Sequence, residues 1–370
     1  MTVNHPDTIY RIALSLCEGV GPILAKNLIN TLGSAEAVFK ESDKTLGSIT
    51  GINIKVRSSI KNDYPLQRAE EEMTFVDRNG FLMHFFQDAS YPRRLKHCAD
   101  APVIIYQKGN LNLNPGKAVS IVGTRSVTDY GRSFIDSFMP DLKGFQPQVI
   151  SGLAYGVDAI AHREALNHQL KTIAVVAHGL DSVYPALHRG LAKDILEQGG
   201  AIVTEFLSKS KPDRENFPKR NRIIAGMSDA VIVVEAARKG GALITADLAF
   251  QYNRDVFAVP GRFRDTYSEG CNLLIKSNRA NLLESTKDLE YIMRWQEQKQ
   301  VQQAQLPLFD EMSTKEQNLI TMLGTDSSPK EIEWLAKKME MPMSQLLVQL
   351  MNLELKGVLI SMPGKRYRLA

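Results

Sequence analysis

The sequence predicts an α/β protein built on an open, doubly wound and mostly parallel sheet. The first observation is a series of short β-branched runs, each followed by Gly, Pro or a polar residue, with helix-length stretches between most of them. The second is the run AVIVVE at 230–235, which is apolar up to its last residue, as in a strand covered on both faces. Such strands pair in parallel through helical crossovers.

The strands expected in this domain are short and buried, and they follow the chain in the order 119–122, 148–150, 172–177, 201–203, 230–235 and 255–259. Upstream, the apolar runs 81–86 and 102–106 predict strands or strand-like edges that pack onto the main domain. His84 lies inside the first of these runs, with no His or Cys close by, so we interpret it as a packed strand residue rather than a ligand.

Length and composition limit the number of domains and the class of protein. The chain has 370 residues, 45 Lys and Arg against 41 Asp and Glu, and a net charge of +4. This length predicts two or three domains, and the mild positive charge permits nucleic-acid binding without requiring it. The cysteines are Cys17, Cys98 and Cys271, far apart and without a CxxC, which indicates reduced thiols rather than disulfides or a metal site. With no leader-like or membrane-length apolar run, we expect a cytoplasmic protein with no membrane association.

The chain divides by composition into four parts. Residues 1–62 predict a helical, helix-hairpin-helix (SAM-like) domain, and residues 63–290 the domain of the mostly parallel sheet. Residues 291–312 predict a Gln-rich linker, and residues 313–370 a winged-helix domain.

The helical domain contains the turn Gly19-Val20-Gly21-Pro22 between two apolar helical patterns. A GxG turn followed by Pro in the next helix's first turn resembles the helix-hairpin-helix pattern, in which backbone N–H groups meet a DNA phosphate. Gly19 and Gly21 are therefore possible DNA contacts. A tight connection without a ligand is the alternative, since only Lys26 supplies positive charge nearby.

The candidate site lies beyond the carboxyl ends of the strands, where open α/β sheets bind ligands. A basic cluster, Lys219, Arg220 and Arg222, precedes the run 230–235, and Gly240-Gly241 then leads into an expected helix at 242–252. A strand, a Gly-rich turn and a helix N-terminus form an anion site, and the basic side chains indicate phosphate. Residues that can converge there are Gly123, Arg125, Ser151, Gly152, Gly156, Glu205, Glu235, Gly240 and Gly241.

Neither a GxGxxG turn with its partner acid nor a GxxxxGK[ST] loop is present, so we expect no dinucleotide or P-loop cofactor. We also expect no metal and no catalytic residue. His162 follows Asp158 on an expected helix, an arrangement that is more often a structural pair than an acid–base site. Asp158 itself is expected to hydrogen-bond the loop 152–156.

Six motifs, in their order along the chain, resemble the DNA processing protein A family (DprA, also called Smf). They are IVGTR, SGLAYGVDAIAH, GLDSVYP, RNRIIAGMSDAVIVVEA, GGALITA and AVPG. The resemblance covers roughly residues 91–280. It implies an extended Rossmann-like domain that binds single-stranded DNA and protects it. It also implies that the protein brings the RecA recombinase onto incoming strands during natural transformation, in the competent state. It also implies a homodimer formed through this domain.

By that resemblance, Arg125 and the basic cluster contact phosphates, together with Asn221 and with the loops that contain Gly123, Ser151-Gly152 and Gly240-Gly241. Where this chain has Gly240-Gly241-Ala242, many members look like Ser-Gly-Ser or Ser-Gly-Thr, so hydroxyl donors are missing here but the backbone N–H groups remain. Phe217 is a possible base-stacking residue, with docking of its own loop as the alternative. For Arg125 the alternative is an internal ion pair with Glu205 or Glu235.

A second class of function uses a similar fold, the nucleotide phosphoribohydrolases of the LOG type. Their PGGxGTxxE-like motif places a catalytic acid about one helical turn into the helix. In this chain Asp247 is the nearest acid after Gly240-Gly241 and does not have that spacing. We therefore expect a DNA-binding protein rather than an enzyme.

The last part reads as three helices, beginning near residues 315, 328 and 342, followed by a hairpin formed by 357–361 and 366–369. This pattern resembles a winged helix, but its third helix carries almost no basic residue. Sequence-specific reading of the major groove normally requires such residues, so a protein-interaction role is favoured. In the linker, the peptide 305–309 (QLPLF) resembles the short sequences that bind the sliding clamp, and the alternative is a plug that packs on its own domain.

Overall fold

The computed structural model describes residues 7–296, 313–324, 328–362 and 364–369. The chain forms two compact units, Met1–Gln298 and Lys299–Ala370. The peptide 305–309 lies outside the described residues. Within the first unit, α14 (Thr286–Met293) continues past residue 290, and Trp295 is buried against the Phe145 ring with centroids 6.3 Å apart. The sheet's unit therefore includes residues that the sequence suggested for the linker.

The first unit is built on one twisted sheet, whose order in the described residues is β1-β2-β6-β5-β4-β3-β7-β8-β9. The strands from β3 onward pair in parallel, whereas β2 joins β6 and β1 joins β2 in antiparallel fashion. Their bounds are β1 (Leu82–Phe85), β2 (Ile104–Lys108), β3 (Ala118–Val122), β4 (Gln148–Ser151), β5 (Thr172–Val175), β6 (Ala201–Thr204), β7 (Ala230–Val233), β8 (Asp255–Ala258) and β9 (Asn281–Leu282). The expected mostly parallel sheet is confirmed, and β9 is an addition.

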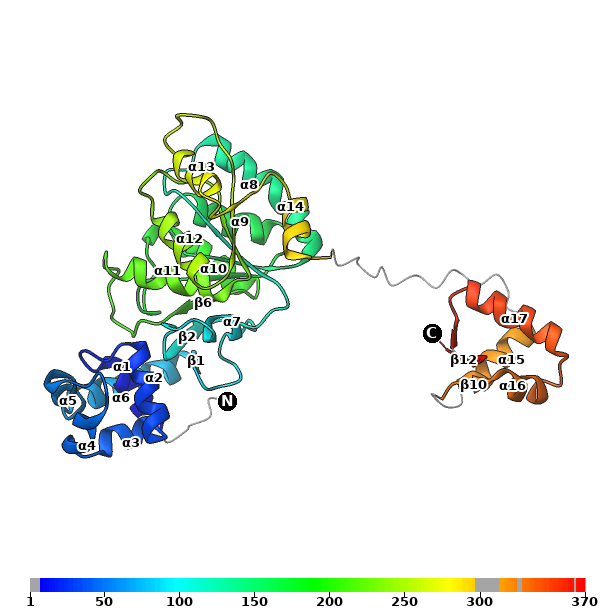
Figure 1. Ribbon diagram of the computed structural model, residues 1–370, viewed down its shortest axis with the longest axis horizontal. Coiled ribbons are helices and arrows are strands. Elements are labelled where there is room, and N and C mark those ends of the chain that lie inside the picture. The colour runs from blue at the N-terminus through cyan, green and yellow to red at the C-terminus, as the bar shows by residue number, and fades with distance from the viewer. Residues whose placement is uncertain (1–6, 297–312, 325–327, 363, 370) are drawn as a thin grey trace. The chain divides into compact units, whose positions relative to one another are not determined.

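Helices cover both faces of this sheet, as Figure 1 shows. On one face, the core of β3 and β7 packs under helices α8, α9 and α14, and α10 continues this layer over β5 and β6. The other face packs under α7, α11, α12 and α13. The bounds are α7 (Arg93–Lys96), α8 (Asp129–Leu142), η1 (Lys143–Phe145), α9 (Val157–Asn167), η2 (Ala186–His188), α10 (Arg189–Glu197), α11 (Asn216–Met227), α12 (Gly241–Gln251) and α13 (Glu269–Lys276). This is the doubly wound arrangement.

The N-terminal helices belong to the same compact unit as the sheet. They are α1 (Thr8–Leu16), α2 (Pro22–Leu32), α3 (Ala35–Lys40), α4 (Asp43–Ser48), α5 (Ile54–Ile60) and α6 (Tyr64–Asn79). The buried Glu72 of α6 accepts hydrogen bonds from the Ser208 backbone N–H (2.9 Å) and hydroxyl (2.5 Å), and Arg68 donates to the Ser208 carbonyl (2.7 Å). These bonds fasten α6 to the loop that follows β6.

The second unit is described by itself. Its described elements are α15 (Thr314–Leu323), β10 (Lys330–Glu331), α16 (Ile332–Lys338), α17 (Met343–Leu355), β11 (Leu359–Met362) and β12 (Arg366–Leu369). The antiparallel order is β10-β12-β11, and a small core that includes Leu319, Leu335 and Leu350 lies beneath it. This is the expected winged helix, with β10 in addition. Across the described residues of the chain, no helix is both long and apolar enough to cross a membrane.

Candidate nucleic-acid interface

The strand order reverses at β3, which lies between β4 on one side and β7 on the other. From β3 the chain proceeds to β4, β5 and β6 in one direction, and it returns across the sheet to β7 on the opposite side. The loops at the carboxyl ends of β3 and β7 therefore separate and leave a crevice, which is where open α/β sheets bind their ligands.

A groove of about 670 Å³, the main groove, occupies this crevice. It is lined by residues from four segments: 122–125 at the end of β3, Ala154 and Asp158 after β4, residues of 214–224 before and along α11, and residues of 236–245 around the start of α12. Of the site residues expected from the sequence, those in the main groove are Gly123, Arg125, Phe217, Arg220, Asn221, Gly240 and Gly241.

Arg125 is an exposed cation of the main groove. Its guanidinium carbon lies 5.2 Å from the centroid of the Phe217 ring, within the range of a cation–π contact. In the described chain neither of its suggested acidic partners pairs with it, because Glu205 pairs with Arg222 and Glu235 accepts from Thr128. The alternative of an internal ion pair for Arg125 is therefore not what the structure shows.

The basic cluster lies on the first turns of α11, and successive helical residues point in different directions. Arg220 is 4% exposed and its Nη1 donates to the Val175 carbonyl at 2.6 Å. Its Nε has no partner in the described chain, and the side chain lines the main groove. Burial lowers the pKa of Arg220 to about 10, so the guanidinium stays charged at neutral pH.

Arg220 is positioned by the loop after β4. Asp158 accepts from the backbone N–H groups of Gly152 (3.1 Å) and Ala154 (3.4 Å), as expected from the sequence, and its charge favours the Arg220 guanidinium. A Cβ at Gly152 would lie 1.9 Å from Arg220 Nη1, so a larger residue there would have to displace the guanidinium. Ser151 is fully buried, and its hydroxyl donates to the Ile121 carbonyl at 2.6 Å, so that hydroxyl is directed into the fold.

The other members of the cluster face a second cavity, the hairpin cavity, which is lined by Gly21, Pro22, Glu205, Lys219 and Arg222 among others. Arg222 forms an ion pair with Glu205 and donates to the Asp100 carbonyl, and the residue is only 9% exposed. Its guanidinium is thus occupied within the protein, contrary to the role in phosphate contact that the sequence suggested. Lys219 is exposed on the rim of this cavity.

Replacing Arg222 with alanine is expected to lower the free energy of unfolding by about 3–5 kcal/mol, because it leaves the Glu205 carboxylate buried without its partner. The measurement is thermal denaturation of the wild type, Arg222→Ala and the double variant Arg222→Ala with Glu205→Gln. The double variant should recover part of the loss. An unchanged melting temperature combined with weaker single-strand binding would instead make Arg222 a DNA contact.

The two glycines of the hairpin turn differ in what the fold requires of them. Gly19 has φ +81°, and an added Cβ would lie 2.9 Å from Val56 Cγ2, so packing alone explains it. Gly21 is the N-cap of α2, and an added Cβ there would meet nothing within 4 Å. Of the two, Gly21 alone leaves open space toward the hairpin cavity.

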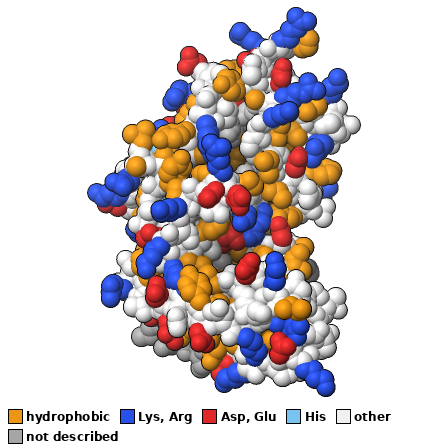
Figure 2. All heavy atoms as spheres, turned by 90° about the vertical axis from the view of Figure 1, so that its left-hand side faces the viewer, with side chains coloured by type: hydrophobic (Ala, Val, Ile, Leu, Met, Phe, Trp, Pro, Cys, Tyr) orange, Lys and Arg blue, Asp and Glu red, His pale blue; other side chains and the backbone are white. Residues whose placement is uncertain are grey.

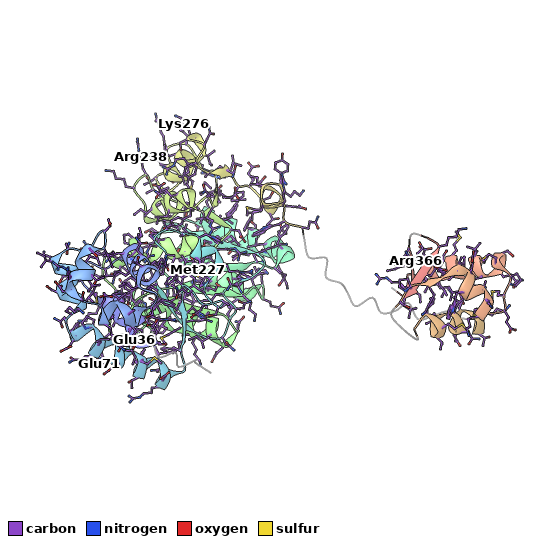
Figure 3. All side chains as sticks on the ribbon, turned by 60° about the horizontal axis from the view of Figure 1, so that its bottom comes forward. Glu36, Glu71, Met227, Arg238, Lys276 and Arg366 are labelled. Carbon is purple, nitrogen blue, oxygen red and sulfur yellow. The ribbon has the colours of Figure 1, made fainter. Side chains whose placement is uncertain are left out.

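At the other end of the main groove, Gly240 is the N-cap of α12 without a side-chain cap, and Asn221 Nδ2 donates to the Gly241 carbonyl at 3.5 Å. Arg238 and Lys239 are exposed on the turn before it, and Arg238 lies at the same end of the first unit as Lys276, away from Glu36 and Glu71 (Figure 3). Figure 2 shows one face of the molecule, where basic side chains alternate with acidic and hydrophobic ones.

His162 is fully buried and is not paired with Asp158. Because the Thr172 hydroxyl donates to the Val149 carbonyl, His162 Nδ1–H donates to Thr172 Oγ1 at 2.7 Å, and Nε2 has no partner in the described chain. Burial lowers the pKa of His162 to about 3, so the ring is neutral at physiological pH. It is a structural residue, although its partner differs from the expected one.

Because of His162, we expect the folded protein to lose stability in acid. The folded-state pKa of this histidine lies below the unfolded value of 6.5, so between pH 6.5 and 3 the unfolded chain binds more protons, and stability falls as the pH drops. At pH 5 the expected loss from this group is about 2 kcal/mol relative to pH 7. Urea unfolding of the wild type and of His162→Gln at both pH values measures it. Identical losses in the two proteins would contradict the assignment.

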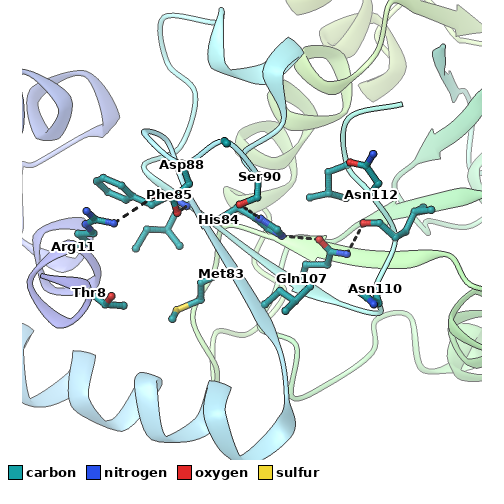
Figure 4. A pocket seen from close by; sticks show the side chains of 15 residues that line it. Thr8, Arg11, Met83, His84, Phe85, Asp88, Ser90, Gln107, Asn110 and Asn112 are labelled. Atoms are coloured by element: carbon teal, nitrogen blue, oxygen red, sulfur yellow. Dashed lines mark hydrogen bonds and ion pairs between the residues drawn. The ribbon is translucent and has the colours of Figure 1, made fainter. Parts of the chain in front are cut away.

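Another cavity, of about 720 Å³, lies between α1 and the strands β1 and β2 (Figure 4). There His84 bridges Ser90 (3.0 Å from Nδ1) and Gln107 (2.7 Å from Nε2), and Gln107 donates to the carbonyls of Gly109 and Leu111. His84 is 8% exposed. It is the packed strand residue that its sequence context indicated, and it joins the two strands at the edge of the sheet.

Comparisons with known proteins show which family the chain resembles. A family model for DNA recombination-mediator protein A matches residues 82–293, and a model for the DprA winged helix domain matches residues 303–365. Protein Smf of Escherichia coli K12 is 32% identical over 340 residues, which cover 90% of each protein. DNA processing protein DprA of Streptococcus pneumoniae is 39% identical over 202 residues, 55% of this chain and 71% of that protein.

Solved structures of the same family also resemble this chain. The X-ray structure of DprA from Streptococcus pneumoniae superposes with a TM-score of 0.63 at 30% identity and covers 79% of this chain and 99% of that one. A structure of DNA processing protein A from Helicobacter pylori has a TM-score of 0.53 at 28% identity and covers 59% of this chain and 99% of that one. The chain belongs to the DNA recombination-mediator protein A family, also known as DprA or Smf.

Proposed function

We propose that this protein binds single-stranded DNA in the main groove, chiefly through its phosphates, protects the strand and loads the RecA recombinase onto it. The observation that carries the proposal is Arg125, an exposed guanidinium beside an aromatic ring at the switch point of the sheet. Non-specific single-strand binding needs a basic groove that follows the backbone and aromatic rings that stack on bases. The Helicobacter pylori relative is described as having a single-stranded DNA binding mode, which supports the same ligand here.

The contacts divide between side chains and backbone. The guanidinium N–H groups of Arg125 donate to phosphate oxygens. Arg220 supplies a fixed positive charge from the buried side of the main groove. The first N–H groups of α12, at the Gly240-Gly241 turn, add a helix N-terminus that favours negative charge. Lys219 and Gly21 lie on the hairpin cavity, where a longer strand would pass after leaving the main groove.

Further partners are proposed from the family resemblance. The protein acts as a homodimer, and its role is in the recombination of DNA taken up in natural transformation. The winged helix is proposed to bind protein rather than DNA, because α17 (Met343–Leu355) carries no Lys or Arg. Binding of the sliding clamp by the peptide 305–309 stays a proposal, tested by a pulldown with wild type and Leu308→Ala plus Phe309→Ala.

The main groove offers no side chain that fits the catalytic acid of a phosphoribohydrolase. Asp247 is the first acid of α12, and it forms an ion pair with Arg279 at 2.5 Å. The only carboxylate that lines the main groove among the described residues is Asp158, which is held by the backbone N–H groups of its own loop. Binding therefore has better support than hydrolysis.

The test of mediation uses RecA on single-stranded DNA that is already coated with single-strand-binding protein. We expect the wild type to shorten the lag in RecA's DNA-dependent ATP hydrolysis, and Arg125→Ala to do so poorly. An unchanged lag with a wild type that binds the strand would remove the mediator role and leave the binding role in place.

A further inference from the structure

The loop that carries Arg125 is bound at both of its ends by a single residue, Glu235, which follows β7 and is 1% exposed. At one end, the Thr124 backbone N–H donates to the Glu235 carbonyl at 2.7 Å. At the other end, the Thr128 backbone N–H donates to Glu235 Oε2 at 2.9 Å and the Thr128 hydroxyl donates to Oε1 at 2.5 Å. We call residues 124–128 the Arg125 loop.

The carboxylate of Glu235 lies at the start of α8. Thr128 is the N-cap of this 14-residue helix, and the positive end of the helix dipole favours a negative charge there. A Cβ at Gly131, in the first turn of α8, would lie 2.5 Å from Glu235 Oε2, so the glycine leaves room for the carboxylate. Glu235 thus ties the end of β7 to the start of α8, with the Arg125 loop closed between them.

The loop after β4 holds the Arg125 loop from a second side. The Val157 backbone N–H donates to the Thr124 carbonyl at 3.1 Å. Gly156 has φ +74°, and an added Cβ would lie 2.3 Å from the Thr124 oxygen and 2.6 Å from the Arg125 oxygen. The backbone of the loop is therefore fixed, although the Arg125 side chain itself is exposed.

A fixed backbone matters for an arginine that binds a ligand from an exposed position. Ordering such a side chain costs conformational entropy, and the cost is smaller where the protein already holds the group near its bound position. Here the closed loop places the Arg125 guanidinium 5.2 Å from the Phe217 ring centroid, on the lining of the main groove. If one end of the loop were released, the guanidinium would sample more positions and bind phosphate more weakly.

We propose that Glu235 is a positioning residue for the phosphate contact of Arg125. It does not touch the strand, because its side chain is buried and is not part of the lining of the main groove. It acts by closing the Arg125 loop before the strand arrives. The inference rests on the proposed function and adds to it a residue from β7, the neighbour of β3 at the switch point of the sheet.

The experiment compares full-length variants of the hydroxyl that Glu235 binds. Thr128→Val keeps nearly the same shape but removes this hydroxyl, and Thr128→Ser is the conservative variant that keeps it. Because Thr128 also caps α8, the matched control is Ser34→Ala. Ser34 caps α3 by accepting from the Ala37 N–H at 3.0 Å, and it lines neither the main groove nor the hairpin cavity.

Anisotropy titrations with labelled oligo-dT across a salt series give the affinity and its salt dependence. We expect Thr128→Val to bind roughly 2- to 10-fold more weakly than wild type, the factor that one hydrogen bond supplies. The slope of log affinity against log salt should fall by up to about 0.7, the value for one phosphate contact. Thr128→Ser and Ser34→Ala should keep both the affinity and the slope of wild type.

A double-mutant cycle tests whether the effect passes through Arg125. In an Arg125→Ala background, Thr128→Val should change the affinity by less than about 2-fold, because the contact that it positions is already lost. Glu235→Leu is the second single variant. It removes both carboxylate oxygens and should bring the affinity close to that of Arg125→Ala, with thermal denaturation as the check that it is folded.

Four outcomes would overturn the inference. Wild-type affinity in both Thr128→Val and folded Glu235→Leu would show that the Arg125 loop stays in place without Glu235. Equal losses from Thr128→Val in the wild-type and Arg125→Ala backgrounds would mean that Glu235 does not act through Arg125. An equal loss in Ser34→Ala would assign the effect to stability. If wild type does not bind oligo-dT, the proposed function fails and this inference fails with it.

Discussion

Arg125→Ala is expected to weaken binding of single-stranded DNA roughly 10- to 100-fold, the range for loss of a charge-assisted contact to phosphate. The side chain is exposed in the main groove and has neither Glu205 nor Glu235 as a partner, so its charge is available to a ligand. Losing one phosphate contact should also reduce the slope of log affinity against log salt by about 0.7. Anisotropy titrations across a salt series measure both quantities.

The matched control for this prediction is Arg163→Ala, since Arg163 is an exposed arginine on α9 that does not line the main groove. It changes the net charge by the same amount. Affinity and slope should then stay near the wild-type values. Equal losses in the two variants would mean that the effect of Arg125 comes from net charge and not from a phosphate contact.

Gly152→Ala is expected to destabilise the first unit by about 3 kcal/mol and to abolish most single-strand binding. The added Cβ would lie 1.9 Å from Arg220 Nη1 and 2.6 Å from Asp158 Oδ2. Arg220 is buried and bonded to the Val175 carbonyl, so it has little room to move aside. The methyl group therefore displaces the guanidinium and the carboxylate that shape the floor of the main groove. Thermal denaturation and anisotropy measure the two effects.

Gly190→Ala is the control for glycine replacement. Gly190 is exposed near the start of α10, and an added Cβ would meet nothing within 4 Å, so the helix should gain roughly 0.5–1 kcal/mol and DNA binding should not change. A Gly152→Ala protein with normal stability and normal affinity would show that the loop after β4 relaxes freely and that the added methyl group does not displace Arg220.

Much of the fold could be predicted from the sequence, because buried parallel strands are continuous apolar runs. The run at 230–235 became β7, and the turn Gly240-Gly241 became the start of α12. The short strands β9 and β10 were missed. Each is two residues long and partly or fully exposed, so neither leaves an apolar signal.

The position of the candidate site in the fold could be predicted from the sequence, but the contacts of its individual side chains could not. Parallel strands fix where loops meet, so Arg125 and the glycine turns could be assigned to one edge of the sheet. The burial of Arg220 and the ion pair of Arg222 depend on α11 being a helix, which turns neighbouring basic residues toward different cavities. Pro218 lies in the first turn of that helix, where proline is tolerated.

The most direct test of the account compares labelled oligo-dT with a matched duplex, by anisotropy across a salt series, on the wild-type protein. The groove predicts tighter binding of the single strand, with affinity falling steeply and linearly in log salt. Equal affinity for the duplex would place the site outside the main groove, with the hairpin turn as the next candidate. No binding of the single strand, together with binding of a nucleoside monophosphate, would contradict the account.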